Sequence, residues 1–165
     1  MHRLKHITIV CLILLSCVGC DQATKVIAKE YLPRNEIMSF ASDTVRLQYV
    51  ENKAGFLSMG SSLPEKTREL IFTVGAGAIV VLMLCYLLVA SSLRPTTTIA
   101  LSLICGGGFG NLIDRILYDG HVIDFLNVGI GGLRTGIFNV ADVALMAGAF
   151  LILLSGTRHG RNDGF

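Results

Sequence analysis

Apolar residues gather in four stretches along the chain, separated by more polar segments. They run from residue 7 to about 28, from 70 to 90, from 96 to 113 and from 136 to 155. A helix needs about 20 mostly apolar residues to cross a bilayer. The second and fourth stretches have this length outright, the third is slightly short, and the first is short unless its polar end lies at the interface. The pattern therefore predicts four transmembrane helices in a single membrane-embedded domain, 1–165.

The two longer polar segments, about 29–69 and 114–135, are expected to lie on one side of the membrane. Val45–Tyr49 alternates apolar and polar residues, which indicates a half-buried strand. Ser62 and Glu65 have the spacing of a capping box, with Pro64 tolerated in the first turn, so a helix is expected to begin there and to continue into the second span. The predicted fold is an all-α membrane protein with a small strand-containing subdomain outside the bilayer.

The composition supports a membrane protein and excludes several other classes. Hydrophobic residues make up 52% and charged residues 16% of the 165 positions, and the mean hydropathy is +0.63. A soluble chain of this size could not bury so much apolar surface. The net charge of +2 is too small for a nucleic-acid-binding protein. No cluster has the spacing of a metal site, and no cofactor is expected. The five cysteines lie in apolar runs, where free thiols behave as small hydrophobic groups.

Charge predicts the orientation of the spans. If both termini are cytoplasmic, the cytoplasmic segments carry five basic residues and one acidic residue, Asp163. Those basic residues are Arg3, Lys5, Arg94, Arg158 and Arg161. Cytoplasmic segments of membrane proteins carry an excess of Lys and Arg, so this orientation places both long polar segments outside the cytoplasm.

Two aspartates stand out against the apolar pattern. A carboxylate in a spanning helix costs about 3 kcal/mol and is by default a candidate functional group. Asp142 lies near the start of the last span, and Asn139 is expected on the same helix face. Asp124 is flanked by apolar residues just before that span. As alternatives, Asp142 could lock helices together through a hydrogen bond and Asp124 could be an exposed loop residue. Together, two such acids could share a proton and activate water.

Further polar pairs have helical i,i+4 spacing. Asn111 and Arg115 lie at the end of the third apolar stretch, and Asp21 and Lys25 follow the core of the first. Arg115 could neutralise nearby acids or hold a substrate carbonyl, or it could simply extend its charged end to the interface. Gly106 and Gly110 form a small-x-x-x-small pattern that permits close helix contact, not a dinucleotide-binding loop.

Two other interpretations of the chain differ in kind. Residues 1–20 have a basic start, an apolar core and a terminal Cys20, as in a cleaved lipoprotein signal peptide, which would make the protein a lipidated anchor. Alternatively, Asp142 could be the ion site of a small transporter, although acids at mid-membrane depth and an internal repeat would then be expected.

Five ordered motifs resemble the lipoprotein signal peptidase family, also called signal peptidase II. They are Asp21-Gln22-x-Thr24-Lys25, the Asn52/Gly55 segment, Gly110-Asn111-x-x-Asp114-Arg115, Val122-Ile123-Asp124-Phe125 and Phe138-Asn139-x-Ala141-Asp142. The resemblance covers about Asp21 to Ala144 and includes the four-span layout. In the second motif Gly55 stands one position later than is usual in the family, which leaves the roles of Asn52 and Gly55 open.

The resemblance implies an aspartic endopeptidase of the bacterial inner membrane, with its active site near the outer face. Such enzymes remove the signal peptide of diacylglyceryl-modified prolipoproteins, on the amino side of the lipidated cysteine, and are sensitive to globomycin-type peptides. By motif match, Asp124 and Asp142 are the catalytic pair. The same resemblance implies that the site is lined or supported by Asn111, Arg115, Asn139, Asp21, Lys25, Asn52 and Gly55. Membrane lipids are expected around the helices, and neither metal nor nucleic acid is implied as a partner.

Overall fold

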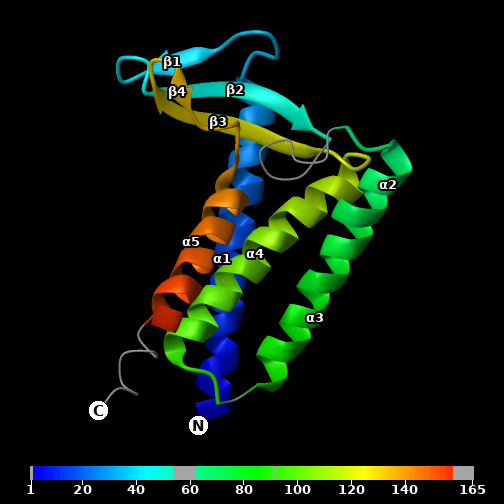
Figure 1. Ribbon diagram of the computed structural model, residues 1–165, viewed down its shortest axis with the longest axis vertical. Helices are drawn as coiled ribbons and strands as arrows, with labels where there is room; N and C mark the ends of the chain where they lie inside the picture. The colour runs from blue at the N-terminus through cyan, green and yellow to red at the C-terminus, as the bar shows by residue number, and fades with distance from the viewer. Residues whose placement is uncertain (1, 54–61, 91, 158–165) are drawn as a thin grey trace.

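A bundle of helices carries a small antiparallel sheet across one end (Figure 1). The structure is a computed structural model, and it describes residues 2–53, 62–90 and 92–157. The helices are α1 (His2–Tyr31), α2 (Glu65–Glu69), α3 (Ala76–Val89), α4 (Pro95–Leu117) and α5 (Val140–Thr157), and a π-helical segment, η2 (Leu70–Gly75), joins α2 to α3. The strands are β1 (Met38–Phe40), β2 (Val45–Asn52), β3 (Val122–Ile130) and β4 (Leu133–Arg134), arranged in that order.

Within the described residues, three helical segments are long and apolar enough to cross a membrane. They are Arg3–Tyr31, the continuous segment Glu65–Val89, and Pro95–Leu117. Val140–Ser155 is apolar but shorter than these. Large apolar side chains remain exposed on the helices, for example Leu15 at 72% and Leu153 at 69%. A bundle that leaves so much apolar surface uncovered requires a lipid environment, so the fold is that of a multi-pass membrane protein.

Glycines on α4 let the neighbouring helices approach closely. A Cβ atom at Gly106 would lie 2.7 Å from the Cβ of Cys17 on α1. At Gly110 it would lie 2.6 Å from Oδ2 of Asp21 and 3.1 Å from the Cβ of Ala141 on α5. The predicted small-x-x-x-small contact is therefore confirmed, and it joins three helices at the level of the polar residues.

The sheet is centred on the antiparallel pair β2–β3. Asn52 lies opposite Val122, and Val50 lies opposite Asp124, with a register shift between Leu47 and Val50. Phe138, just before α5, exchanges two backbone hydrogen bonds of 2.8 Å with Leu126 of β3. This bridge ties the start of α5 to the sheet. The predicted strand at Val45–Tyr49 is confirmed as part of β2.

Three local predictions differ from the structure. The capping box is wrong: Pro64 precedes α2, no side chain caps this helix, and Glu65 is the first helical residue rather than the third. Because the residue before a proline favours extended backbone, the helix cannot begin at Ser62. The last helix begins at Val140 rather than at 136. The segment 114–135, expected as a loop, contains the end of α4 and strands β3 and β4.

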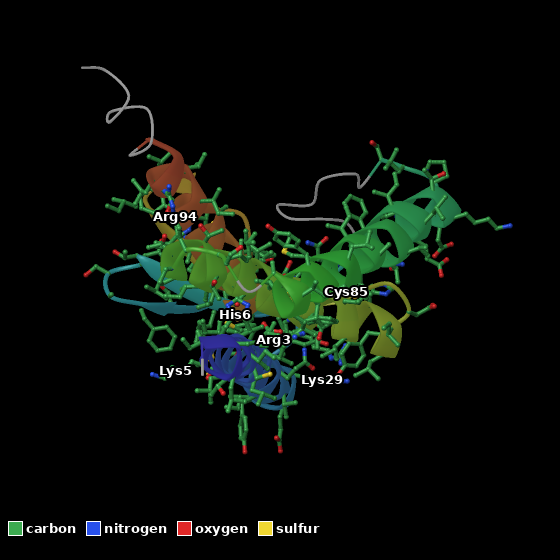
Figure 2. The ribbon with its side chains drawn as sticks, turned by 90° about the horizontal axis from the view of Figure 1, so that it is seen from below. Arg3, Lys5, His6, Lys29, Cys85 and Arg94 are labelled. Atoms are coloured by element: carbon green, nitrogen blue, oxygen red, sulfur yellow. The ribbon has the colours of Figure 1, made fainter. Side chains whose placement is uncertain are left out.

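The ends of the helices that lie away from the sheet carry basic residues. Figure 2 views the molecule from this end, where Arg3 and Lys5 begin α1 and Arg94 precedes α4. The ring of His6 lies beside them, with Nε2 2.7 Å from the carbonyl oxygen of Leu87 on α3. Asp124 and Asp142 belong to the opposite, sheet-bearing end (Figure 1).

Candidate functional site

Asp124 is buried in the sheet near the start of β3, with 3% of its surface exposed. Its Oδ2 accepts a hydrogen bond of 2.9 Å from Nδ2 of Asn52, the last residue of β2. Its Oδ1 accepts a hydrogen bond of 2.7 Å from Nδ2 of Asn139. The pairing of β2 with β3 thus brings Asn52, 72 residues distant in sequence, to the carboxylate. The alternative of an exposed loop aspartate is wrong.

Asp142 lies in the first turn of α5, with 5% of its surface exposed. Asn139 directly precedes this helix, and its Oδ1 accepts a hydrogen bond of 3.0 Å from the backbone N–H of Asp142. In return, Oδ2 of Asp142 accepts one of 3.3 Å from the backbone N–H of Asn139. This reciprocal pair is a capping box, which explains why the helix begins where it does. Asn139 and Asp142 therefore contact each other as helix cap and first-turn acid, not as neighbours on one helix face.

Two buried asparagines connect the carboxylates. Asn111 on α4 donates from Nδ2 to Oδ1 of Asp142 over 2.9 Å. Its Oδ1 accepts a hydrogen bond of 3.0 Å from Nδ2 of Asn139, the same group that donates to Asp124. One amide network thus fixes both acids, where β3, α4 and the start of α5 meet.

A buried cluster of charged side chains on α1 and α4 supports this network. Nζ of Lys25 on α1 lies 2.7 Å from Oδ2 of Asp21 and 2.9 Å from Oδ2 of Asp114. It also donates to Oδ1 of Asn111 over 3.1 Å. The three charged side chains are at most 2% exposed. Buried charges persist only when they are paired and hydrogen-bonded, and here Lys25 links α1 to the network that holds Asp142.

The two acids of the cluster also hold backbone groups. Oδ1 of Asp21 accepts the backbone N–H of Ala141 at the start of α5 over 2.9 Å. Oδ2 of Asp114 accepts the backbone N–H of Ile123 on β3 over 3.0 Å. The residues preceding Asp142 and Asp124 in the sequence are therefore both anchored to this cluster.

Arg115 lies beside the carboxylates at the end of α4. Its Nη1 donates to the backbone carbonyl of Asn111 over 3.3 Å, and its guanidinium carbon lies 6.0 Å from the ring centre of Phe72 in η2. Its charge acts on those of Asp142 and Asp124. The side chain is therefore a cation close to both acids, on the side of the site that faces η2.

Burial raises the pKa of Asp124 to about 7. The hydrogen bond from Asn52 lowers this pKa, the nearby charge of Asp142 raises it, and the hydrogen bond from Asn139 lowers it again. Desolvation disfavours the charged carboxylate and a second carboxylate adds repulsion, so the proton is held to near-neutral pH. Two acids in such a setting can act as a pair in which one accepts a proton while the other donates one.

The structure brings together most of the site residues predicted from the sequence. The carboxylates and their amides are in contact, and the Asp21–Lys25 pair supports them; Gly55 lies outside the described residues. Sequence reasoning missed Asp114, which pairs with Lys25 across two helices, and Gln22, whose Nε2 donates to Oδ1 of Asp114 over 2.9 Å. Gln22 belongs to the Asp21 motif and Asp114 to the Asn111 motif. Their position beside predicted site residues was the signal in the sequence that could have identified them.

Fold and site together define a class, that of membrane proteins with a buried carboxylate pair where a helix bundle meets a small sheet. Residues 13–158 match the family model described as Signal peptidase (SPase) II. Because this match covers most of the chain, the chain belongs to the signal peptidase II family. The family predicted from the sequence is thereby confirmed.

Individual relatives agree with this assignment. The chain is 34% identical over 148 residues to the lipoprotein signal peptidase of Treponema pallidum (strain Nichols), covering 84% of this chain and 77% of that protein. It is 38% identical over 133 residues to the lipoprotein signal peptidase of Janthinobacterium sp. (strain Marseille), covering 81% and 78%. A match to the Burkholderia vietnamiensis lipoprotein signal peptidase is 42% identical over 107 residues, covering 65% of this chain and 61% of that protein.

Two solved structures share the fold. Each is described as a bacterial membrane enzyme studied by the in meso method. One has a TM-score of 0.80 at 24% identity, covering 94% of this chain and 91% of that chain. The other has a TM-score of 0.76 at 25% identity, covering 88% and 90%. The likeness extends over nearly the whole chain, sheet and bundle included.

Proposed function

We propose that this chain is an aspartic endopeptidase that removes signal peptides from diacylglyceryl-modified prolipoproteins. It cuts on the amino side of the lipidated cysteine, as its sequence motifs imply. One observation carries the proposal: Asp124 and Asp142 are both buried and both hydrogen-bonded to the Asn111–Asn139 amide network. Membership of the signal peptidase II family and the names of the relatives support the substrate.

In the proposed reaction, Asp124 and Asp142 share one proton. The deprotonated carboxylate takes a proton from water, and the resulting hydroxide attacks the peptide carbonyl carbon. The C–N bond then breaks, and the protonated carboxyl group gives its proton to the leaving amine of the lipidated cysteine. The pKa of Asp124, raised to about 7 by burial, supports a proton held within the pair at neutral pH. A coupled pair titrates as a unit, so the two roles belong to the pair.

The neighbouring groups have positioning roles in this scheme. Arg115 orients the scissile carbonyl, while Asn52, Asn111 and Asn139 hold the carboxylates through their side-chain amides. Asp21 and Lys25 act on the carboxylates indirectly, because they fix the helices that carry the asparagine amides. For Gly55 we propose only what the family resemblance implies, that it lines or supports the site.

The proposed placement in the membrane follows from charge and fold. All four long helical segments cross the bacterial inner membrane, α5 included. Both termini are cytoplasmic, and the sheet with the acids lies at the outer face, where lipid chains of the substrate fit between the helices. Peptide inhibitors of the globomycin type are expected to compete with the substrate. The alternative of a lipoprotein anchor cleaved before Cys20 would remove Val10, which is buried in the bundle core, and Cys17, which packs against Gly106 of α4.

Cleavage of a diacylglyceryl-modified prolipoprotein by purified protein tests the proposal. Wild-type protein is expected to release the signal peptide, and Asp124→Asn and Asp142→Asn are each expected to lose at least about a thousandfold in rate, as removal of an acid–base group does. Glu36→Gln is the matched control, because Glu36 is exposed, lies outside the site and is expected to leave the rate unchanged. Near-wild-type turnover by either folded site variant would refute the pair, and failure of wild-type protein on verified lipidated substrate would refute the activity.

A further inference from the structure

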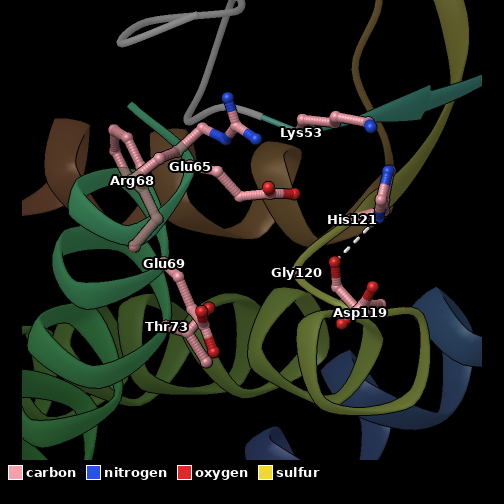
Figure 3. Close-up of a pocket in the computed structure, with 9 residues that line it drawn as sticks. Lys53, Glu65, Arg68, Glu69, Thr73, Asp119, Gly120 and His121 are labelled. Carbon is pink, nitrogen blue, oxygen red and sulfur yellow. Dashed lines mark hydrogen bonds between the residues drawn. The ribbon is translucent and has the colours of Figure 1, made fainter. Parts of the chain in front are cut away.

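A second polar cavity lies beside the carboxylate site, between the α2–η2 segment and the ends of β2 and β3 (Figure 3). It has a volume of about 260 Å³. Six ionisable side chains line it: Lys53, Glu65, Arg68, Glu69, Asp119 and His121. Figure 3 shows Glu65 reaching from α2 towards the wall formed by Lys53 and His121.

The cavity adjoins the proposed reaction centre on two sides. Lys53 directly follows Asn52, whose amide donates to Asp124. Phe72, which lines the cavity, lies beneath the guanidinium of Arg115. A peptide held at the carboxylates can therefore extend into this cavity within a few residues of the scissile bond.

The ionisable side chains of the cavity are not paired with one another or with other charges among the described residues. Among the described residues, none of the six ionisable side chains forms an ion pair within 4.0 Å. Oγ1 of Thr73, a residue that also lines the cavity, is buried and has no hydrogen-bond partner among the described residues. The charged side chains of the cavity are therefore available to a ligand, whereas the buried oxygen of Thr73 is closed off from it.

The local backbone supports the same conclusion. Thr73 lies in η2, a π-helical segment within an otherwise α-helical span. Such segments are frequent at functional sites. On the opposite wall, Nδ1 of His121 lies 2.7 Å from the carbonyl oxygen of Tyr118 and 2.9 Å from that of Asp119. Nδ1 of the neutral ring therefore carries the proton, which leaves Nε2 as an acceptor on the cavity side.

We infer that this cavity binds the polar peptide segment that follows the lipidated cysteine, and that it favours basic over acidic residues there. The inference rests on the proposed function. The signal peptide and the lipid chains are apolar and fit the bundle, whereas only the mature segment is polar enough for a cavity with this lining. Three carboxylates, Glu65, Glu69 and Asp119, face two cations, so the cavity carries a net negative charge when His121 is neutral.

The test compares three diacylglyceryl-modified peptides that differ only at the second and third residues after the cysteine, which are Lys-Lys, Ser-Ser or Asp-Asp. For the wild-type protein at low salt, KM is expected to be about fivefold lower for Lys-Lys than for Asp-Asp, as for partly exposed charge pairs, with kcat within about twofold. Equal KM values for the three peptides would overturn the inference while leaving the proposed function intact. Failure to cleave any of them would overturn both.

Variants locate the effect in the cavity. The double substitution Glu65→Gln and Glu69→Gln is expected to reduce the KM ratio to less than about twofold, because it removes two of the three carboxylates of the cavity. Glu36→Gln is the matched control, since Glu36 is exposed and does not line this cavity. A folded double variant that kept the full wild-type ratio would overturn the assignment to this cavity.

Discussion

Two opposing influences act on the pKa of Asp124. Burial raises its pKa to about 7, while the amide of Asn52 stabilises the charged form and lowers that pKa. Asp142 faces it as a second acid, and Lys25 and Arg115 are the nearby cations. A carboxylate balanced in this way changes its protonation within the physiological pH range, which makes the pH dependence of the proposed reaction informative.

The first prediction is a loss of activity at alkaline pH. If the pair works with one shared proton, kcat/KM falls as the pH rises through about 7, because Asp124 then loses its proton. Asn52→Ala removes a donor that favours the charged carboxylate, so the pKa rises and the alkaline limb moves to higher pH. The measurement is kcat/KM from pH 5 to 9 on a lipidated peptide, with exposed Asn35→Ala as the control. A shift of the limb to lower pH in Asn52→Ala would contradict this account.

A second prediction concerns Lys25, whose charge is fully buried between two acids. Lys25→Met leaves Asp21 and Asp114 buried without their cation, and breaking a buried pair in this way costs about 3–5 kcal/mol. We therefore expect a large fall in the thermal unfolding temperature in detergent. Lys29→Met, one helical turn later on the same helix, is the control, because Lys29 is exposed and its Nζ lies 4.3 Å from the centre of the Tyr118 ring. Equal unfolding temperatures for the two variants would contradict a stabilising role for Lys25.

At the scale of elements, the site depends on how closely three helices approach one another. Gly110 lies where α4 meets Asp21 of α1 and Ala141 of α5, so the spacing of these helices sets the position of Asp142 in the following turn. Any side chain at this position would have to displace either the buried charged cluster or the start of α5.

Gly110→Ala is accordingly predicted to destabilise the protein by about 1–3 kcal/mol, as overpacking of a core does, and to lower activity with it. Thermal unfolding in detergent and peptide cleavage are the two measurements. Gly19→Ala provides the contrast, since a Cβ at Gly19 of α1 meets nothing within 4 Å and alanine favours helix there. If Gly110→Ala unfolded at or above the wild-type temperature, the close approach of the helices at Gly110 would not be needed for stability.

Element by element, local patterns explain what the sequence predicted well. Apolar runs indicated the helices, alternation indicated part of β2, and i,i+4 spacing indicated the Asp21–Lys25 pair. Strand β3 was not predicted because Val122–Phe125 is buried throughout and lacks the alternation of buried and exposed residues that indicates a strand. Its pairing with β2 depends on residues about 70 positions away, and the Lys25–Asp114 contact likewise joins two helices. The capping box of Asn139 and Asp142 was visible as an Asn-x-x-Asp spacing, but the expected helix start at 136 concealed it.

At the scale of the whole molecule, the two ends differ in chemistry. One end carries the sheet and the carboxylate pair, and the other carries the start of α1, the end of α5 and the basic residues Arg3, Lys5 and Arg94 (Figures 1 and 2). Cytoplasmic ends of membrane proteins are enriched in Lys and Arg, so this polarity favours a sheet on the outer side. An outward-facing site is what a peptidase acting on exported lipoproteins requires.

Reporter fusions test this orientation and the crossing by α5 together. Green fluorescent protein fused after Thr157 is expected to fluoresce, because that end of α5 would be cytoplasmic. Alkaline phosphatase inserted between Gly131 and Gly132, at the β3–β4 turn where a Cβ meets nothing within 4 Å, is expected to be active only outside the cytoplasm. Inserting the phosphatase after Ala90, between α3 and α4, is the control and should give no activity. If the fusion after Thr157 did not fluoresce while the insertion between Gly131 and Gly132 was active, α5 would not cross the membrane, and the active site would then need a different route to its lipid-anchored substrate.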